Sequence, residues 1–356
     1  MAAGYEPVRV AFDRVLAAAE GTGAAVAVWR GGEWVVDLWG GRADAAGTRR
    51  WQRDSLVQPY SVSKPFAAVC ALLLAARGAL DLDAPVARYW PEFSAPATVR
   101  QVLSHQAGVV ALTEPVPTEV FYDWDRLCAL LAAQPPAWPP GTAHGESALF
   151  YGHLVGEIVR RVDGRRLGRF LREEVCGPLG LDVAVGLDAD QRARAVELTG
   201  FESQRGGSQG GESRPALYAA ATGNPPGNLD PAVVNGAAWR AAEIPAVNAH
   251  GTARGIAGLY AALLRGDLLP EAVLREATTA HCSGPDAVMG GHSAWGLGFG
   301  VDEDGYGMGG LGGNYAGASR TGAYAIAFVT GTLGGFDRLD AVENALRGVL
   351  GLPPLE

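Results

Sequence analysis

The chain has 356 residues, of which 48% are hydrophobic and 19% are charged, and its formal net charge is −9. This composition excludes a disordered or fibrous protein and supplies enough apolar surface for a large core in one or two domains. Its basic residues form no stripe that could follow a phosphate backbone, so a nucleic acid is not an expected partner.

The first expected elements are a helix and a β-hairpin. Residues 7–20 place apolar side chains at helical spacing and stop at Gly21, which is typical of an amphipathic helix with a glycine end. The segments 24–30 and 34–39 are rich in strand-forming residues and flank the glycine pair 31–32, a hairpin signal. The sequence therefore predicts a sheet that begins near the N-terminus.

The middle of the chain has mainly helical patterns. Helices are expected within residues 62–77, 145–161 and 165–176. Residues 203–230 contain GGSQGGES and GNPPGN, which predict a long mobile loop beside or over the functional site. The longest apolar stretch, 66–76, is too short to cross a bilayer, so no membrane span is expected.

The C-terminal third returns to mixed structure, with expected helices at 252–265 and 337–349 and an expected strand at 321–330. Strands at both ends of the chain around a helical middle predict an α+β fold. In this hypothesis residues 1–57 and 246–356 form the sheet domain, and residues 58–245 form a mainly helical inserted domain.

No cofactor or metal is expected, because the cysteines and histidines lack the spacing of known metal sites. Gly307, Gly309 and Gly312 spell GxGxxG, but the motif precedes a strand near the C-terminus without a βαβ unit, which argues against a dinucleotide. The opening residues MAAGYEPVRVAFDR place Glu6 before any apolar run, unlike a secretory signal peptide, so a cytoplasmic location is expected.

The lysine content gives the strongest functional signal. Of 29 basic residues, Lys64 is the only lysine, and it lies three residues after Ser61. An arginine cannot lose a proton at neutral pH, whereas a desolvated lysine can. A helix that starts near Ser61 would place both side chains on one face and direct its amide groups at a developing oxyanion. The alternative is a chance SxxK sequence, because this short motif is common.

Several segments together resemble the β-lactamase-like serine hydrolases, the group of class C β-lactamases, DD-peptidases and family VIII carboxylesterases. The likeness covers nearly the whole chain and includes PYSVSKPFAA, VRQVLSHQAGV, PPGTAHGESALFYGHLVGEIVRRVDG and GMGGLGGNYAG. The resemblance implies an antiparallel sheet flanked by helices, a helical inserted domain, and acylation of Ser61. His105, within LSHQAG, is expected to brace a turn near the site.

The chain departs from the pattern of this family at two positions. Glu146 stands where the family has a tyrosine that moves protons with the lysine, and Met308 begins the Met308-Gly309-Gly310 segment where the family has Lys-Thr-Gly or His-x-Gly. Glu146 is interpreted as a general base coupled to Lys64, as an anchor for a cationic amine of the substrate, or as a helix cap.

The other expected site residues surround this centre. The Leu311 amide could join the Ser61 amide in an oxyanion hole, and Gly309 and Gly310 permit close approach of the substrate. Met308 is expected either in a wall of an acyl pocket or in the core. Tyr60 and Tyr151 are the tyrosines that could replace the missing one, although Tyr151 also fits a core position.

Three functions remain open at this point. The first is a hydrolase that cleaves a small ester or amide through a Ser61 acyl-enzyme. The second is a transacylase that passes the acyl group to an amine or alcohol, as some relatives do in natural-product assembly. The third is an inactive relative that binds a ligand. Met308 in place of a cation favours esterase-like chemistry over β-lactam hydrolysis. Substrate contacts are expected in residues 110–125 and 203–245.

Overall fold

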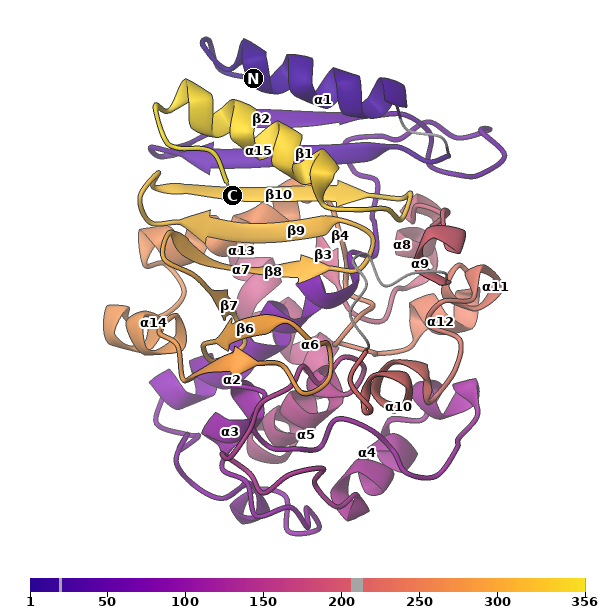
Figure 1. The fold of residues 1–356 in the computed structure, drawn as a ribbon, viewed down its shortest axis with the longest axis vertical. Coiled ribbons are helices and arrows are strands. Elements are labelled where there is room, and N and C mark those ends of the chain that lie inside the picture. The colour runs from indigo at the N-terminus through magenta and orange to yellow at the C-terminus, as the bar shows by residue number, and fades with distance from the viewer. Residues whose placement is uncertain (19–20, 206–213, 356) are drawn as a thin grey trace.

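The structure is a computed structural model that describes residues 1–18, 21–205 and 214–355. Its centre is an antiparallel sheet of eight strands in the order β2-β1-β10-β9-β8-β7-β6-β5 (Figure 1). In that order the strands are Glu33–Gly40, Ala24–Arg30, Tyr324–Thr330, Asn314–Ser319, Gly305–Gly310, Gly300–Val301, His292–Trp295 and Cys282–Pro285. The first and last parts of the chain therefore build one sheet, which confirms the predicted α+β fold.

Strand β10 shows why the sheet needs cover on both faces. All seven of its residues are buried. Ala325, Ala327 and Val329 face one apolar cluster, whereas Ile326 and Phe328 face a second cluster. Because successive side chains of a strand point to opposite faces, a continuous apolar strand is stable only between two layers.

Two helices from opposite ends of the chain cover one face of the sheet. α1 (Glu6–Ala18) and α15 (Asp337–Val349) pack side by side there, as Figure 1 shows. α15 buries Leu339, Val342 and Leu346, which lie on one helical face. Both predicted terminal helices are confirmed, except that residues 19 and 20 of the first prediction lie outside the described ranges.

The other face of the sheet packs against α13 (Ala253–Arg265) and, beyond it, the helical part of the chain. The helices between the sheet segments are η1 Tyr60–Ser63, α2 Lys64–Ala76, η2 Val86–Arg88, α3 Val99–Leu103, η3 Thr118–Tyr122, α4 Trp124–Ala133, α5 Tyr151–Asp163, α6 Leu167–Leu171, η4 Arg172–Cys176, α7 Gly177–Leu179, α8 Ala189–Arg194, α9 Glu202–Arg205, α10 Tyr218–Gly223, α11 Pro231–Val234 and α12 Ala237–Ala241; α14 Glu271–Ala277 follows α13. A two-stranded ladder joins β3 (Val183–Ala184) to β4 (His250–Gly251).

Two sequence-based expectations for the middle of the chain need correction. The helix expected from residue 145 begins at Tyr151, so the six preceding residues form turns and extended chain. The segment expected as a loop over 203–230 contains α10, and its residues 206–213 lie outside the described ranges. The domain boundaries at 57/58 and 245/246 remain a prediction.

Within the described ranges, no helix combines the length and the apolarity that a bilayer crossing requires.

The predicted hairpin at the start of the sheet is confirmed. Gly31 and Gly32 connect β1 to β2 with φ angles of 61° and 94°, values in the left-handed region that favours glycine.

Candidate active site

Ser61 lies in the second position of η1, directly after a strained residue. Tyr60 has a φ of 49°, and a left-handed conformation costs a non-glycine residue about 1–2 kcal/mol. Tyr60 is nevertheless fixed, because its side chain is buried and its hydroxyl donates a hydrogen bond to the Asn228 carbonyl at 2.8 Å. This anchored turn presents Ser61 at the start of the helical segment that continues as α2.

Lys64 is the first residue of α2, and its side chain is fully buried. Its Nζ donates hydrogen bonds to Ser61 Oγ at 2.7 Å, to the Ala148 carbonyl at 3.0 Å and to the Ala246 carbonyl at 3.3 Å. Burial lowers the pKa of Lys64, and the neighbouring Glu146 carboxylate opposes this effect without cancelling it. The i, i+3 spacing read from the sequence thus brings the amine to the hydroxyl.

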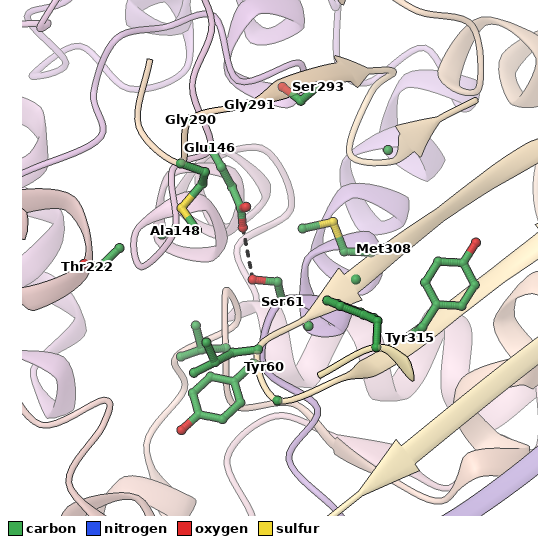
Figure 2. Close-up of a pocket in the computed structure, with 18 of the residues that line it drawn as sticks. Tyr60, Ser61, Glu146, Ala148, Thr222, Gly290, Gly291, Ser293, Met308 and Tyr315 are labelled. Carbon is green, nitrogen blue, oxygen red and sulfur yellow. Dashed lines mark hydrogen bonds between the residues drawn. The ribbon is translucent and has the colours of Figure 1, made fainter. Parts of the chain in front are cut away.

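Glu146 completes a three-membered cluster with these two side chains. Its Oε1 accepts a hydrogen bond from Ser61 Oγ at 3.0 Å (Figure 2). The same oxygen lies 2.8 Å from Lys64 Nζ. Burial raises the pKa of Glu146, but the charge of Lys64 and the hydrogen bonds from both partners lower it by a larger amount. The net pKa therefore lies below the usual value. The expectation of a helix cap is wrong, because α5 begins only at Tyr151.

His105 holds the turn that carries Glu146. Its φ is 60°, its Nδ1 accepts a hydrogen bond from the Ser147 amide at 3.1 Å, and its carbonyl accepts one from the Gly145 amide at 3.1 Å. The ring packs against Tyr151 and Trp295. Burial lowers the pKa of His105 to about 3, so the imidazole is neutral at pH 7. The structure confirms the expectation that His105 braces a turn near the site.

Strand β8 forms the opposite side of the site. A Cβ on Gly310 would lie 2.1 Å from the Pro59 carbonyl, so this glycine allows β8 to approach η1. Gly310 therefore leaves room for the backbone that precedes Ser61, whereas the sequence suggested that it leaves room for the substrate. Met308, Gly309 and Leu311 line the same cavity as Ser61, and Figure 2 shows Met308 beside it.

The cavity in front of Ser61 has a volume of about 720 Å³. Its apolar lining includes Leu229, Val247 and Met289. Residues from the two described parts of the segment expected as a loop, within 203–204 and 214–229, form one wall of the cavity. This supports the expected position of the segment beside the site. None of the residues 110–125 lines the cavity, so that expectation is wrong.

Neither tyrosine considered as a replacement for the family tyrosine has its hydroxyl at the cluster. The Tyr60 hydroxyl points away from Ser61 toward the Asn228 carbonyl (Figure 2). Tyr151 does not line the cavity. It is fully buried, and its hydroxyl donates to the Leu103 carbonyl at 3.1 Å. Burial raises the pKa of both phenols. Tyr151 is therefore a core residue, as the alternative interpretation held.

Sequence reasoning missed the turn between β5 and β6. Met289, Gly290 and Gly291 of this turn and Ser293 of β6 line the cavity. Figure 2 shows Gly290 and Gly291 near Glu146. The segment is rich in glycine and has no periodic pattern, so the only local signal was its turn composition.

The sheet, its helical cover and the buried Ser–Lys contact at a helix start define a fold of the β-lactamase/transpeptidase type. The crystal structure of a family VIII carboxylesterase superimposes with a TM-score of 0.88 and 36% identity over 98% of both chains. A penicillin-binding protein homolog from Caulobacter crescentus gives a TM-score of 0.88 and 34% identity, again over 98% of both chains. The family model described as Beta-lactamase matches residues 11–349. The chain belongs to the β-lactamase family, a group of esterase- and β-lactamase-type serine hydrolases.

Curated relatives match over shorter stretches. The chain is 33% identical to Esterase/beta-lactamase LipL of Mycobacterium tuberculosis (strain ATCC 25618 / H37Rv) over 269 residues, which are 68% of this chain and 59% of LipL. It is 31% identical to Esterase EstB of Burkholderia gladioli over 192 residues, 48% of each protein. The matches thus span about half of these two relatives.

Proposed function

We propose that the protein is a serine esterase or amidase that forms an acyl-enzyme on Ser61. The observation that carries this proposal is the mutual contact of three side chains: Ser61 Oγ lies 2.7 Å from Lys64 Nζ and 3.0 Å from Glu146 Oε1. A serine hydroxyl is a weak nucleophile until a neighbouring base takes its proton. Here two bases adjoin one hydroxyl.

In the acylation step, Ser61 Oγ forms a bond to the acyl carbon and the bond to the leaving oxygen or nitrogen breaks. The hydroxyl proton passes to the Lys64–Glu146 pair and from there to the leaving group. The buried amine and the carboxylate share protons as a coupled pair, so the pair both accepts and returns this proton. Because burial lowers the pKa of Lys64, its neutral form, which can accept the Ser61 proton, is more accessible than in a solvent-exposed lysine.

In the deacylation step, we assign the general base to Glu146. Its side chain is 12% exposed toward the cavity, whereas the Lys64 side chain is 0% exposed. A water molecule that enters the cavity can therefore reach the carboxylate but not the amine. Glu146 takes a proton from this water, the water oxygen bonds to the acyl carbon, and Ser61 leaves with a proton from the pair.

The amides of Ser61 and Leu311 are proposed as the oxyanion hole. Both residues border the cavity, and Gly310 lets the two segments approach each other. Preorganised amide donors stabilise the charge that develops on the carbonyl oxygen in the transition state. Met308 offers an apolar, flexible surface and no cation, which suits an uncharged acyl group.

The experiment that tests this function is hydrolysis of p-nitrophenyl esters whose acyl chains range from acetyl to octanoyl. Wild-type protein is expected to turn over these esters, and Ser61→Ala is expected to lose that turnover. Equal turnover by the two proteins would reject the proposal. Rapid hydrolysis of nitrocefin would show that β-lactams, and not simple esters, are the better substrates.

Acyl transfer is the second candidate. The cavity of about 720 Å³ falls in the range of small-molecule sites that hold a complete drug-sized ligand, which leaves room for an acceptor beside a short acyl group. A competition assay separates the two outcomes. Partition of the acyl group to an added amine or alcohol far above the acceptor's reactivity in solution would favour transfer, whereas release of the acid alone would favour hydrolysis.

A further inference from the structure

Asp286, in the turn between β5 and β6, is hydrogen-bonded to the backbone amide of Glu146, the candidate base. Its side chain is buried, with 4% of the residue exposed. The carboxylate accepts hydrogen bonds from the Glu146 amide at 3.1 and 3.3 Å, from the amides of Val288 and Met289 at 2.9 and 2.8 Å, and from the Ser293 hydroxyl at 3.1 Å. Four donor groups thus converge on one buried side chain, which holds Glu146, Val288, Met289 and Ser293 together.

This contact matters because Glu146 is not held by a helix. The amides on either side of it, those of Gly145 and Ser147, both donate to His105. The amide of Glu146 itself donates to Asp286, a residue 140 positions away. The backbone position of Glu146 is therefore set by two partners from other parts of the chain. His105 binds the flanking amides, and Asp286 binds the amide of Glu146 itself.

The same carboxylate also shapes the wall of the cavity. It binds the amides of Val288 and Met289 and so closes the turn whose Met289, Gly290 and Gly291 line the cavity. Figure 2 shows Gly290 and Gly291 near Glu146. A second link reinforces this connection, because the Ala287 amide donates to the carbonyl of His144 at 3.0 Å. The turn and the segment that carries Glu146 therefore form one hydrogen-bonded unit.

We propose that Asp286 is a positioning residue that holds Glu146 at the distance from Ser61 that deacylation requires. This inference rests on the proposed function, since it assumes that Glu146 is the deacylation base. Asp286 makes no hydrogen bond to Ser61 or Lys64, so it acts on the reaction through the residues that it holds, Glu146 and the cavity turn. A displacement of about 1 Å at a reacting group can reduce a rate by about 100-fold.

The test compares Asp286→Asn with wild type in a single-turnover assay. An asparagine keeps the size of the side chain but replaces one acceptor oxygen by an NH2 donor. In either orientation this donor faces the Glu146 amide, which lies near both oxygens of Asp286. The acyl-enzyme is formed with p-nitrophenyl butyrate, and its decay is followed by intact mass. We expect a first-order deacylation rate about 10- to 100-fold lower than in wild type, with one acyl group still bound per active enzyme.

A double-mutant cycle separates positioning from a general structural role. In a Glu146→Gln background the deacylation base is absent, so Asp286→Asn is expected to change the residual rate by less than about twofold. Asp44→Asn is the matched control. Asp44 is another buried carboxylate, which binds the Thr48 amide and hydroxyl and the Arg49 amide, and none of these residues lines the cavity. This variant is expected to lose stability but to deacylate at the wild-type rate.

The deacylation rate is a first-order constant, so it does not depend on how much of a variant is folded. If Asp286→Asn yields no folded protein, Asp286→Ser, which keeps a short oxygen acceptor, replaces it. A wild-type deacylation rate in these variants, or an equally large effect in the Glu146→Gln background, would overturn the inference. Failure of the proposed function would be distinguishable, because Ser61 would then carry no acyl group in wild type.

Discussion

At the scale of single residues, the candidate site consists of an amine and a carboxylate that both contact one hydroxyl. Lys64 is buried beside Glu146, and each favours the charged form of the other, whereas burial penalises both charges. Ser61 adjoins both of them. A change in either partner therefore alters both the charge state of the other and the reactivity of the serine.

Removal of the carboxylate charge separates the two chemical steps. In Glu146→Gln, Lys64 can still accept the Ser61 proton, but no base faces the incoming water. We expect a burst of one product molecule per enzyme, followed by turnover about 100-fold or more below wild type, a typical contribution of a general base. Stopped-flow release of p-nitrophenol together with intact mass checks this expectation. Unchanged steady-state turnover would reject the role of Glu146.

The pH dependence of acylation gives a second test with a defined sign. Glu146 raises the pKa of Lys64, since a carboxylate stabilises the ammonium form. Glu146→Gln therefore lowers this pKa, and the neutral amine appears at lower pH. The rate of fluorophosphonate labelling of Ser61 should rise with pH in both proteins, and its midpoint should lie at lower pH in Glu146→Gln. A shift of the midpoint to higher pH would contradict the assigned roles.

At the scale of elements, the site depends on the fit between β8 and the start of η1. Gly310 lies against the Pro59 carbonyl, and Tyr60 takes a left-handed conformation immediately before Ser61. The sheet and the helical segment that carries Ser61 are thus in contact through backbone atoms. No local sequence pattern reports such a contact.

Gly310→Ala tests this contact. Its Cβ would force β8 and η1 apart, so we expect a labelling rate of Ser61 reduced by about 100-fold and a loss of stability of about 1–3 kcal/mol. Gly348→Ala in α15 is the control, because a Cβ there has no neighbouring heavy atom within 4 Å. It should label like wild type and be slightly more stable. Thermal unfolding and labelling kinetics measure both effects, and wild-type labelling in Gly310→Ala would contradict the argument.

At the scale of the whole molecule, one apolar core joins the sheet to the helical part. A single cluster of buried residues contains Trp29 and Val329 from the sheet as well as Leu131 and Phe170 from the helices. The candidate active site lies where these parts meet, with Ser61 and Glu146 on one side and β8 on the other. Movement of one part against the other would therefore draw β8 away from Ser61 and Glu146 and open the cavity.

This shared core predicts cooperative unfolding. Denaturant titrations followed by far-UV circular dichroism and by tryptophan fluorescence should give coincident single transitions, since the nine tryptophans are distributed over both parts. Two separated transitions would show that the sheet and the helical region unfold as independent domains.

The sequence was most informative where local spacing determines geometry. The Ser61–Lys64 pair follows from a helical turn, and the last helix follows from its apolar periodicity. Strands β5 to β7 were not predicted, because they are short and contain few of the residues that favour strands. The contact between Asp286 and Glu146 could not be predicted either, because it joins positions 140 residues apart without a shared pattern.

The most direct test of the central claim is the intact mass of the protein after treatment with a fluorophosphonate probe. The account predicts one probe adduct per wild-type chain, located on Ser61, and no adduct in Ser61→Ala or Lys64→Ala. A folded wild-type protein that remains unlabelled, or an adduct that persists in Ser61→Ala, would contradict the claim that Ser61 is a nucleophile activated by Lys64 and Glu146.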